Sequence, residues 1–255
     1  MAGRWVDTHG HLFMLDDPPD EVLARARASG VDWVVCPGVD AASARAARTI
    51  AEAHPGSVSW TAGLHPHDAE RWGDEAEAIA ELADAASAIG ECGLDFYRNL
   101  APREAQLSAF REQLALATDK DLPIVIHCRD AFADVFEHLA DADLGERAVL
   151  HCWTGGPKWT KRFRELGVMF SFAGPLTYRT GETLRLGAAQ APPEQTLVET
   201  DAPYLTPEPK RSEANEPAHV VLTGAVLADV WGADVTTVAA QTTANAERVF
   251  GRPGG

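Results

Sequence analysis

The sequence predicts an α/β protein built as a single-domain (β/α)8 barrel of the TIM type. Its 255 residues match the length of about 250 residues that is typical of this barrel. Eight strand-like apolar runs alternate with helix-like segments, a pattern that indicates βαβ units and a parallel sheet. The first run also lacks the glycine-rich phosphate loop that nucleotide-binding, doubly wound sheets carry after their first strand. We therefore expect one barrel domain over residues 1–250 and a flexible tail over 251–255.

The eight expected strands are short and mainly apolar, as parallel strands buried on both faces are. Most of them begin 20 to 35 residues after the preceding one. In chain order they are Trp5–His9, Val31–Val39, Val58–Leu64, Ala88–Leu94, Pro123–His127, Ala148–Cys152, Val168–Phe172 and Thr196–Thr200.

The expected helices are alanine-rich and amphipathic. In the segment Arg103–Lys120, Leu107, Phe110, Leu114 and Ala117 recur at i, i+3, i+7 and i+10, which places them on one buried helix face. Comparable segments are Asp20–Ser29, Ala41–Ala53 and Ala76–Ala86 between the strands, and Pro217–Trp231 and Val235–Phe250 after the eighth run.

The composition argues against a membrane or secreted protein. No apolar run reaches the roughly 18 to 20 residues that a membrane span needs, and the first seven residues contain no apolar signal-peptide core. Four cysteines lie in apolar runs without CxxC spacing: Cys36, Cys92, Cys128 and Cys152. This arrangement predicts buried, reduced thiols in a cytoplasmic protein rather than disulfides or a zinc knuckle. We expect a monomer with no membrane partner.

The net charge limits the expected partners. The chain has 22 Lys+Arg against 38 Asp+Glu, for a net charge of −16. Such a surface repels polyanions at long range, so a broad basic face that clamps duplex DNA is not expected. A local cationic pocket or bound divalent ions stay compatible with this charge.

Metal-ligating side chains gather at the expected strand ends, where barrels of this type place their active sites. Three of the nine histidines, His54, His138 and His219, lie elsewhere. The six at strand ends are His9, His11, His65, His67, His127 and His151, and the carboxylates found there include Glu91, Asp95 and Asp201. One such histidine alone is as well explained as a hydrogen-bonded core residue, but so many together favour a site.

The ligand types predict a centre with two divalent ions. His9 and His11 are two residues apart in a strand, so both imidazoles face the same way and can bind one ion. Imidazole combined with carboxylate suits Zn, Mn or Fe. The predicted ligand set is His9, His11, Glu91, His127, His151 and Asp201. It is sufficient for two ions about 3.5–4 Å apart with a bridging carboxylate, which activate a water and stabilise the leaving oxygen of a phosphodiester.

Other residues near these ligands have two interpretations each. His65 is close to its strand and favours the site, whereas for His67 a surface loop is equally compatible. Asp7, two residues before His9, is expected to brace an imidazole rather than to bind metal. Asp95 either belongs to the site or caps the turn that follows its strand.

Arg129 directly follows an expected ligand-bearing strand end. Its guanidinium can hold a substrate phosphate through paired hydrogen bonds. The alternative is an ion pair with Asp130 or Asp95.

Taken together, six motifs resemble the TatD family of metal-dependent deoxyribonucleases. They are Asp7–Leu12 (DTHGHL), Gly63–His67 (GLHPH), Ile89–Arg98 (IGECGLDFYR), Pro123–Ala131 (PIVIHCRDA), His151–Gly156 (HCWTGG) and Glu199–Pro207 (ETDAPYLTP). Asn215–Pro217 matches a further family signature, so the resemblance extends from residue 5 to about 250 with all motifs in order.

The resemblance implies a role for each residue of the site. His9 and His11 would bind one ion, His127 and His151 the other, and Glu91 would bridge them. Asp201 would complete the first site and orient or deprotonate the attacking water. His65 is expected near the scissile phosphate, and Arg129 in or beside the pocket. The implied activity is hydrolysis of DNA, typically at single-stranded ends, with two divalent ions (Zn, Mg or Mn) as cofactors.

Several positions depart from the family pattern without removing a ligand. Gly10 replaces the usual Cys, Phe13 a frequent acidic residue and Trp153 the usual Phe, while Lys210–Ala214 is less basic than its counterpart. Together with the net charge of −16, these differences keep two alternative substrates open. One is an ester, such as the aminoacyl linkage cleaved by an aminoacyl-tRNA deacylase, and the other is a small phosphodiester. A non-enzymatic barrel is disfavoured, because buried ligands without a metal would cost stability. In other members of the superfamily a carbamylated lysine at this point of the barrel bridges the two ions. Here the residue is Glu91, which favours the TatD type.

Overall fold

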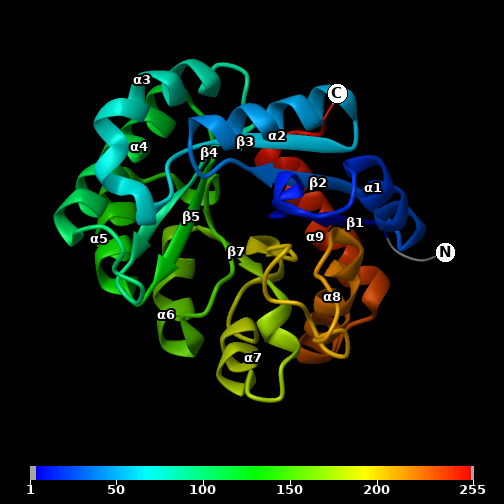
Figure 1. The fold of residues 1–255 in the computed structure, drawn as a ribbon. Coiled ribbons are helices and arrows are strands. Elements are labelled where there is room, and N and C mark those ends of the chain that lie inside the picture. The colour runs from blue at the N-terminus through cyan, green and yellow to red at the C-terminus, as the bar shows by residue number, and fades with distance from the viewer. Residues whose placement is uncertain (1–3, 254–255) are drawn as a thin grey trace.

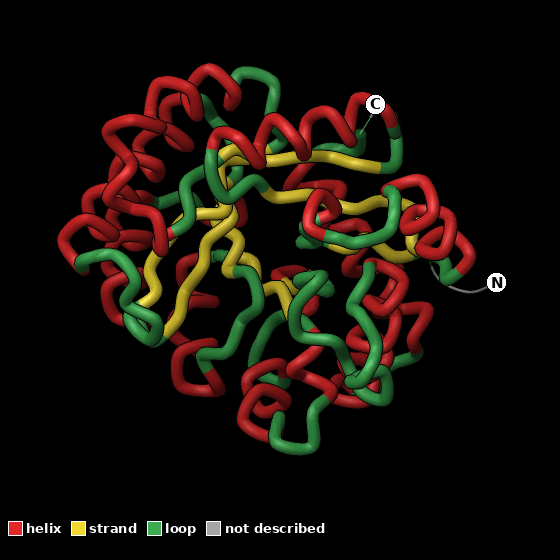
Figure 2. Tube along the Cα trace, viewed as in Figure 1, coloured by secondary structure: helices red, strands yellow, loops and turns green. Residues whose placement is uncertain are grey.

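The computed structural model describes residues 4–253 and confirms the predicted barrel. Within these residues, parallel strands form one sheet in the order β1 to β8, and helices surround it (Figures 1 and 2). The strands are β1 (Trp5–Asp7), β2 (Val31–Pro37), β3 (Val58–Ala62), β4 (Ala88–Asp95), β5 (Ile124–Arg129), β6 (Ala148–Leu150), β7 (Met169–Phe172) and β8 (Thr196–Val198). Several strands end before the predicted limit, because the residues that follow leave the hydrogen-bonded sheet and turn into the cavity described below. Of the predicted tail 251–255, the last two residues lie outside the described part.

The helices follow the strands in alternation and cover the outside of the barrel. They are α1 (Pro19–Ala28), α2 (Ala41–Ala53), α3 (Trp72–Ala83), α4 (Arg103–Asp119), α5 (Phe132–Ala142), α6 (Gly156–Phe163), α7 (Glu182–Ala188), α8 (Val220–Trp231) and α9 (Val235–Phe250). Short 3-10 helices are η1 (Leu12–Met14), η2 (Pro66–Arg71), η3 (Gly145–Arg147), η4 (Arg164–Leu166), η5 (Gly174–Thr177), η6 (Pro193–Gln195) and η7 (Pro217–His219). Among the described residues no single helix is long and apolar enough to cross a membrane; only the sharply bent pair 217–231 and 235–250 reaches that length and composition jointly.

Backbone contacts between the first and last strands close the barrel. The amide of Thr8 donates to the carbonyl of Val198 (3.2 Å), and the amide of Asp201 donates to the carbonyl of His9 (2.8 Å). Gly10 and Ala202 form a further parallel bridge. This closure brings residues about 190 positions apart into one site.

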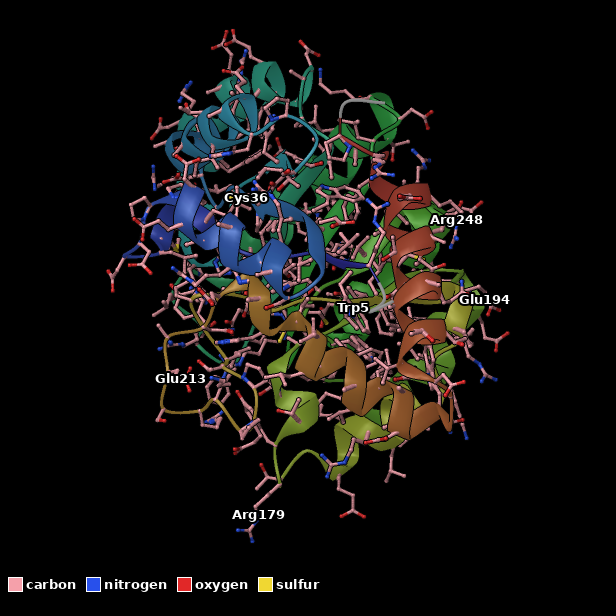
Figure 3. All side chains as sticks on the ribbon, turned by 90° about the vertical axis from the view of Figure 1, so that its right-hand side faces the viewer. Trp5, Cys36, Arg179, Glu194, Glu213 and Arg248 are labelled. Atoms are coloured by element: carbon pink, nitrogen blue, oxygen red, sulfur yellow. The ribbon has the colours of Figure 1, made fainter. Side chains whose placement is uncertain are left out.

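The amino end of the barrel is filled with apolar side chains. Trp33 and Val35 of β2 pack in one buried cluster with Phe250 of α9, and the rings of Trp33 and Phe250 lie 6.4 Å apart. Figure 3 shows Arg248 of α9 on the side of the molecule opposite to Glu213, which lies in the long segment after β8. The apolar cluster thus closes the amino end of the barrel, and the cavity described below lies at the carboxyl end.

Gly93 allows β4 to approach β5 at the level of the site. Its φ of +129° is open to glycine alone, and a Cβ there would lie 2.1 Å from the carbonyl oxygen of His127. We therefore expect Gly93→Ala to lower the free energy of unfolding by at least about 3 kcal/mol in a urea titration. The control Gly73→Ala, in α3 with no atom within 4 Å of the added Cβ, should stabilise by up to about 1 kcal/mol. Equal unfolding midpoints for the two variants would contradict this view of the β4–β5 contact.

Candidate metal centre

The predicted site residues converge on one cavity at the carboxyl end of the barrel. The cavity has a volume of about 550 Å³. Its lining includes His11, His65, His67, Glu91, Asp95, His127, Arg129, His151 and Asp201, and His9 lies fully buried beneath it in contact with Glu91 and His151. All six histidines expected at strand ends are thus brought together, whereas His54, His138 and His219 are on or beside helices of the outer layer.

Four donor atoms, from β4 and from the segments that follow β1 and β8, form the first potential ion site. Glu91 Oε2 lies 3.3 Å from His9 Nε2 and 3.6 Å from His11 Nε2. Asp201 Oδ1 lies 3.7 Å from each of the same two nitrogens. Tetrahedral ligands about 2.0–2.2 Å from a zinc ion lie about 3.3–3.6 Å from one another. The donor spacing therefore fits one divalent ion.

The other oxygen of Glu91 belongs to a second donor set, from β4, β5 and the residue that follows β6. Glu91 Oε1 lies 2.9 Å from His151 Nε2 and 3.1 Å from His127 Nδ1. The two imidazole nitrogens are 3.2 Å apart. Because the two oxygens of one carboxylate face different donor sets, Glu91 has the geometry of a bridging ligand.

Hydrogen bonds on the opposite ring nitrogens of His11, His127 and His151 select, for the neutral rings, the tautomer whose donor nitrogen carries no proton. The Nδ1–H of His11 donates to the carbonyl of Pro37 (3.3 Å). The Nδ1–H of His151 donates to Glu199 (3.2 Å), and the Nε2–H of His127 donates to Asp95 (3.3 Å). A carbonyl or carboxylate partner on one nitrogen fixes the tautomer in which the other presents its lone pair to a metal.

His9 provides an independent indication of a ligand. Its side chain is fully buried, yet neither ring nitrogen forms a hydrogen bond with any residue among 4–253. The ring stacks on His151 with a centroid distance of 4.0 Å. Such an unpaired buried polar group is costly in a protein interior, and coordination of an ion would satisfy it.

The electrostatic environment keeps the carboxylates ionised. Burial alone would raise the pKa of Glu91, but the surrounding imidazoles, foremost His151, hold that pKa well below its usual value. In the same way, burial of Asp201 is outweighed by hydrogen bonding to His11 and by the nearby His151, and its pKa is lowered. Both side chains therefore offer anionic oxygens at neutral pH.

His65 lies next to Glu91 and directs a ring N–H toward it. Its Nδ1 accepts the amide hydrogen of His67 (3.2 Å), so the neutral ring carries its proton on Nε2, 3.3 Å from Glu91 Oε1. Burial lowers the pKa of His65 to about 4. In this tautomer His65 is a hydrogen-bond donor, although its nitrogen also forms a group of potential ligands with Glu91 and His127.

The expectation that Asp7 braces an imidazole is wrong. Its carboxylate accepts hydrogen bonds from the amide of His9 (3.3 Å) and from the amide (2.8 Å) and hydroxyl (2.6 Å) of Thr200. Burial raises the pKa of Asp7 to about 8. Asp7 does not brace an imidazole because closure of the barrel places the amide and hydroxyl of Thr200 against its carboxylate. Asp7 thereby fixes the end of β1 beside the segment that carries Asp201.

Asp95 combines both of the roles considered for it. Its Oδ1 accepts the amide hydrogens of Tyr97 (3.0 Å) and Arg98 (2.8 Å) and so caps the turn after β4. Its Oδ2 lies 2.8 Å from His67 Nε2 and 3.3 Å from His127 Nε2. His67 therefore belongs to the site through Asp95.

Arg129 forms neither of the ion pairs considered as alternatives. Within residues 4–253 its guanidinium has no carboxylate partner within 4 Å; instead it lies over the ring of Tyr97 at 4.1 Å, and it lines the cavity. Of the four cysteines, three are buried as expected, while Cys152 is half-buried and lines the cavity.

Glu199 is a site residue that the sequence interpretation did not select. It is fully buried, receives hydrogen bonds from the ring of His151 (3.2 Å) and from the amide of Cys152 (2.8 Å), and has one oxygen without a partner among the described residues. Together with His9 and His151 it forms a third group of potential ligands. Its place at the end of the eighth expected strand, two residues before Asp201, is the signal that could have identified it.

The donor arrangement predicts that divalent ions stabilise the fold. At 100 times its dissociation constant, a ligand that binds only the native state adds about 2.7 kcal/mol, which in a domain of this size raises Tm by about 5–10 °C. We expect a chelator to lower Tm by this amount in a thermal scan, and added Mn or Zn to restore it. In the variant Glu91→Ala the chelator should have a much smaller effect. An identical Tm of the wild-type chain with and without chelator would contradict this prediction.

Comparison with known proteins agrees with the geometry. The sequence matches the family model of TatD related DNase over residues 6–251. It is 41% identical over 242 residues to the 3'-5' ssDNA/RNA exonuclease TatD of Citrobacter rodentium, covering 91% of each chain. It is 35% identical over 252 residues to YabD of Bacillus subtilis, an uncharacterized metal-dependent hydrolase, covering 96% of this chain and 98% of the relative.

A solved structure shows the same architecture. The crystal structure of YjjV, a TatD homolog from Escherichia coli K12, matches with a TM-score of 0.92 and 28% identity, over 99% of this chain and 100% of that one. The chain therefore belongs to the TatD related DNase family of metal-dependent hydrolases, the family and enzyme class that its motifs predict.

Proposed function

We propose that this chain is a two-metal nuclease that hydrolyses phosphodiester bonds at single-stranded DNA ends. The observation that carries the proposal is the division of the Glu91 carboxylate between two donor sets. One oxygen faces His9 and His11, and the other faces His127 and His151. Metal pairs that share a carboxylate are typical of enzymes that displace a phosphate ester by water.

In this proposal His9, His11 and Asp201 would hold one divalent ion, His127 and His151 would hold the other, and Glu91 would offer an oxygen to each. When bound, the two ions supply a water activated at neutral pH and positive charge for the phosphate. The ion in use is Zn, Mg or Mn: the imidazoles favour zinc, whereas Mg and Mn suit the carboxylates.

The protein groups around the cavity have separate tasks in the reaction. Asp201 is ionised and lines the cavity, so it can accept a hydrogen bond from the attacking water and then its proton. His65 is neutral, holds its proton on Nε2 and lines the same cavity, so it can donate a hydrogen bond to a phosphoryl oxygen. Arg129 lines the cavity without a carboxylate partner among the described residues, so it can bind a phosphate through paired hydrogen bonds.

The proposed substrate agrees with the relatives and with the charge. Curated relatives that are 38–41% identical are named 3'-5' ssDNA/RNA exonucleases. The net charge of −16 disfavours broad contact with duplex DNA, whereas one strand end entering a cavity needs only local cations. The proposal includes a monomeric, cytoplasmic protein, as expected from the sequence.

Digestion of a single-stranded oligonucleotide tests the proposal. The protein is stripped of metal, reloaded with Mg, Mn or Zn, and incubated with strands labelled at the 5' or the 3' end. We expect a metal-dependent ladder that shortens the 5'-labelled strand from its 3' end and is absent with Asp201→Asn. No cleavage by protein that holds two ions would refute the nuclease. In that case the acidic surface would favour a compact ester, such as an aminoacyl-tRNA linkage, or a small phosphodiester.

A further inference from the structure

An exposed tyrosine lies at the rim of the cavity. Tyr97 is in the turn that follows β4, and its side chain is 63% exposed. The guanidinium of Arg129, a residue that lines the cavity, lies over one face of the ring at 4.1 Å from its centroid. One exposed aromatic side chain is common on a protein surface. Tyr97 is distinguished by its contact with an arginine that lines the cavity of the metal ligands.

Two free cations accompany this ring. Arg98 and Arg129 both line the cavity, and within residues 4–253 neither guanidinium has a carboxylate within 4 Å. Arg103, which lies over the nearby ring of Phe96, is in contrast paired with Asp134 at 2.6 Å. Because both arginines line the cavity that holds the metal ligands, they supply local positive charge for an anion in a chain whose net charge is −16.

Asp95 fixes this rim relative to the metal ligands. One of its oxygens binds the amides of Tyr97 and Arg98, at 3.0 and 2.8 Å, and the other lies 3.3 Å from His127. Tyr97 is therefore attached through a single buried side chain to a residue of the second donor set. The backbone of Tyr97 therefore has a defined position relative to the second donor set, and its ring contacts Arg129.

We propose that Tyr97 is a stacking surface for one nucleobase of a single strand, with neighbouring phosphates held by Arg98 and Arg129. The inference rests on the proposed function and specifies its substrate. Every nucleobase offers a flat π-face to an aromatic ring, so the contact tolerates any sequence. In a duplex those faces are covered by the adjacent base pairs, so the subsite selects a single strand. The second face of the Tyr97 ring, away from Arg129, is the one that would take the base.

A double-mutant cycle between protein and strand isolates the stacking contact. Affinities are measured by fluorescence anisotropy in the Asp201→Asn background, with Mg, for a labelled oligothymidylate and for a strand of equal length whose central residues lack bases. Tyr97→Ala should weaken binding of the oligothymidylate about tenfold, because stacking on one aromatic ring contributes at that level. Tyr97→Ala should change the affinity for the abasic strand by less than about twofold. The difference between the two fold-changes measures the interaction between Tyr97 and the bases. Tyr97→Phe, which keeps the ring, should restore the affinity for the oligothymidylate.

Each outcome decides one part of the inference. An equal loss for both strands would mean that Tyr97 only positions Arg129, and the stacking surface would be refuted. Leu186→Ala, which removes another exposed apolar side chain on α7, serves as the control for unspecific effects. If the wild-type chain binds the strand with the expected dependence on Tyr97 but never cleaves it, the subsite stands and the nuclease fails. If it binds no strand at all, both fail.

Discussion

Replacing Glu91 by alanine is expected to reduce the bound metal to one ion or none and to lower hydrolysis by more than about a thousandfold. Both oxygens of this carboxylate are engaged, one within 3.6 Å of His9 and His11 and the other within 3.1 Å of His127 and His151. Its removal takes one ligand oxygen from each donor set, together with the negative charge that lies between the two sets. Loss of several kcal/mol of transition-state stabilisation corresponds to a factor of this size.

The measurement is the metal-to-protein ratio by elemental analysis, together with turnover of a labelled strand. Glu81→Ala, which removes an exposed carboxylate on α3, is the matched control and should keep both values. Circular dichroism establishes that the Glu91 variant is folded. Two ions retained per Glu91→Ala chain would mean that the bridging ligand is elsewhere.

Asp201→Asn is expected to abolish most turnover while leaving the fold intact. The substitution keeps the shape of the side chain but removes its charge and its ability to take a proton. General-base assistance contributes about 10²–10⁴-fold, and partial loss of a ligand adds to this, so we expect a decrease of about a thousandfold or more. The backbone at Asp201 has φ +57°, a conformation that asparagine adopts as readily as aspartate.

A thermal scan and initial rates check this prediction. The Tm of metal-free Asp201→Asn should stay within a few degrees of the metal-free wild type. Asp229→Asn, at an exposed position of α8, should leave the rate unchanged. Full activity of Asp201→Asn would exclude this carboxylate from the mechanism.

Local patterns in the sequence were sufficient to predict the barrel and the side chains that its carboxyl end brings together. Parallel strands buried on both faces appear as continuous apolar runs, and all eight expected runs correspond to β1–β8. The helix Val235–Phe250 has the predicted limits, and the helix predicted over Arg103–Lys120 ends one residue earlier. The carboxyl ends of all strands of a barrel lie at one rim. Histidines at these ends are therefore close together whenever the barrel is predicted correctly.

Contacts that depend on closure of the barrel could not be predicted from local patterns. The hydrogen bonds from Thr200 to Asp7 join residues 193 positions apart, and no spacing rule announces them. Helix α3 begins at Trp72, four residues before the predicted start, because Trp72 packs in the core and continues η2 directly. The tautomer of each imidazole likewise depends on partners such as Pro37 and Glu199, which come from other strands.

Anomalous diffraction from crystals soaked in Mn or Zn tests the two-metal centre most directly. The account predicts two peaks about 3.5–4 Å apart on either side of Glu91. One peak should contact His9, His11 and Asp201, and the other should contact His127 and His151. A single peak, or a second peak on residues outside this cavity, would contradict the account.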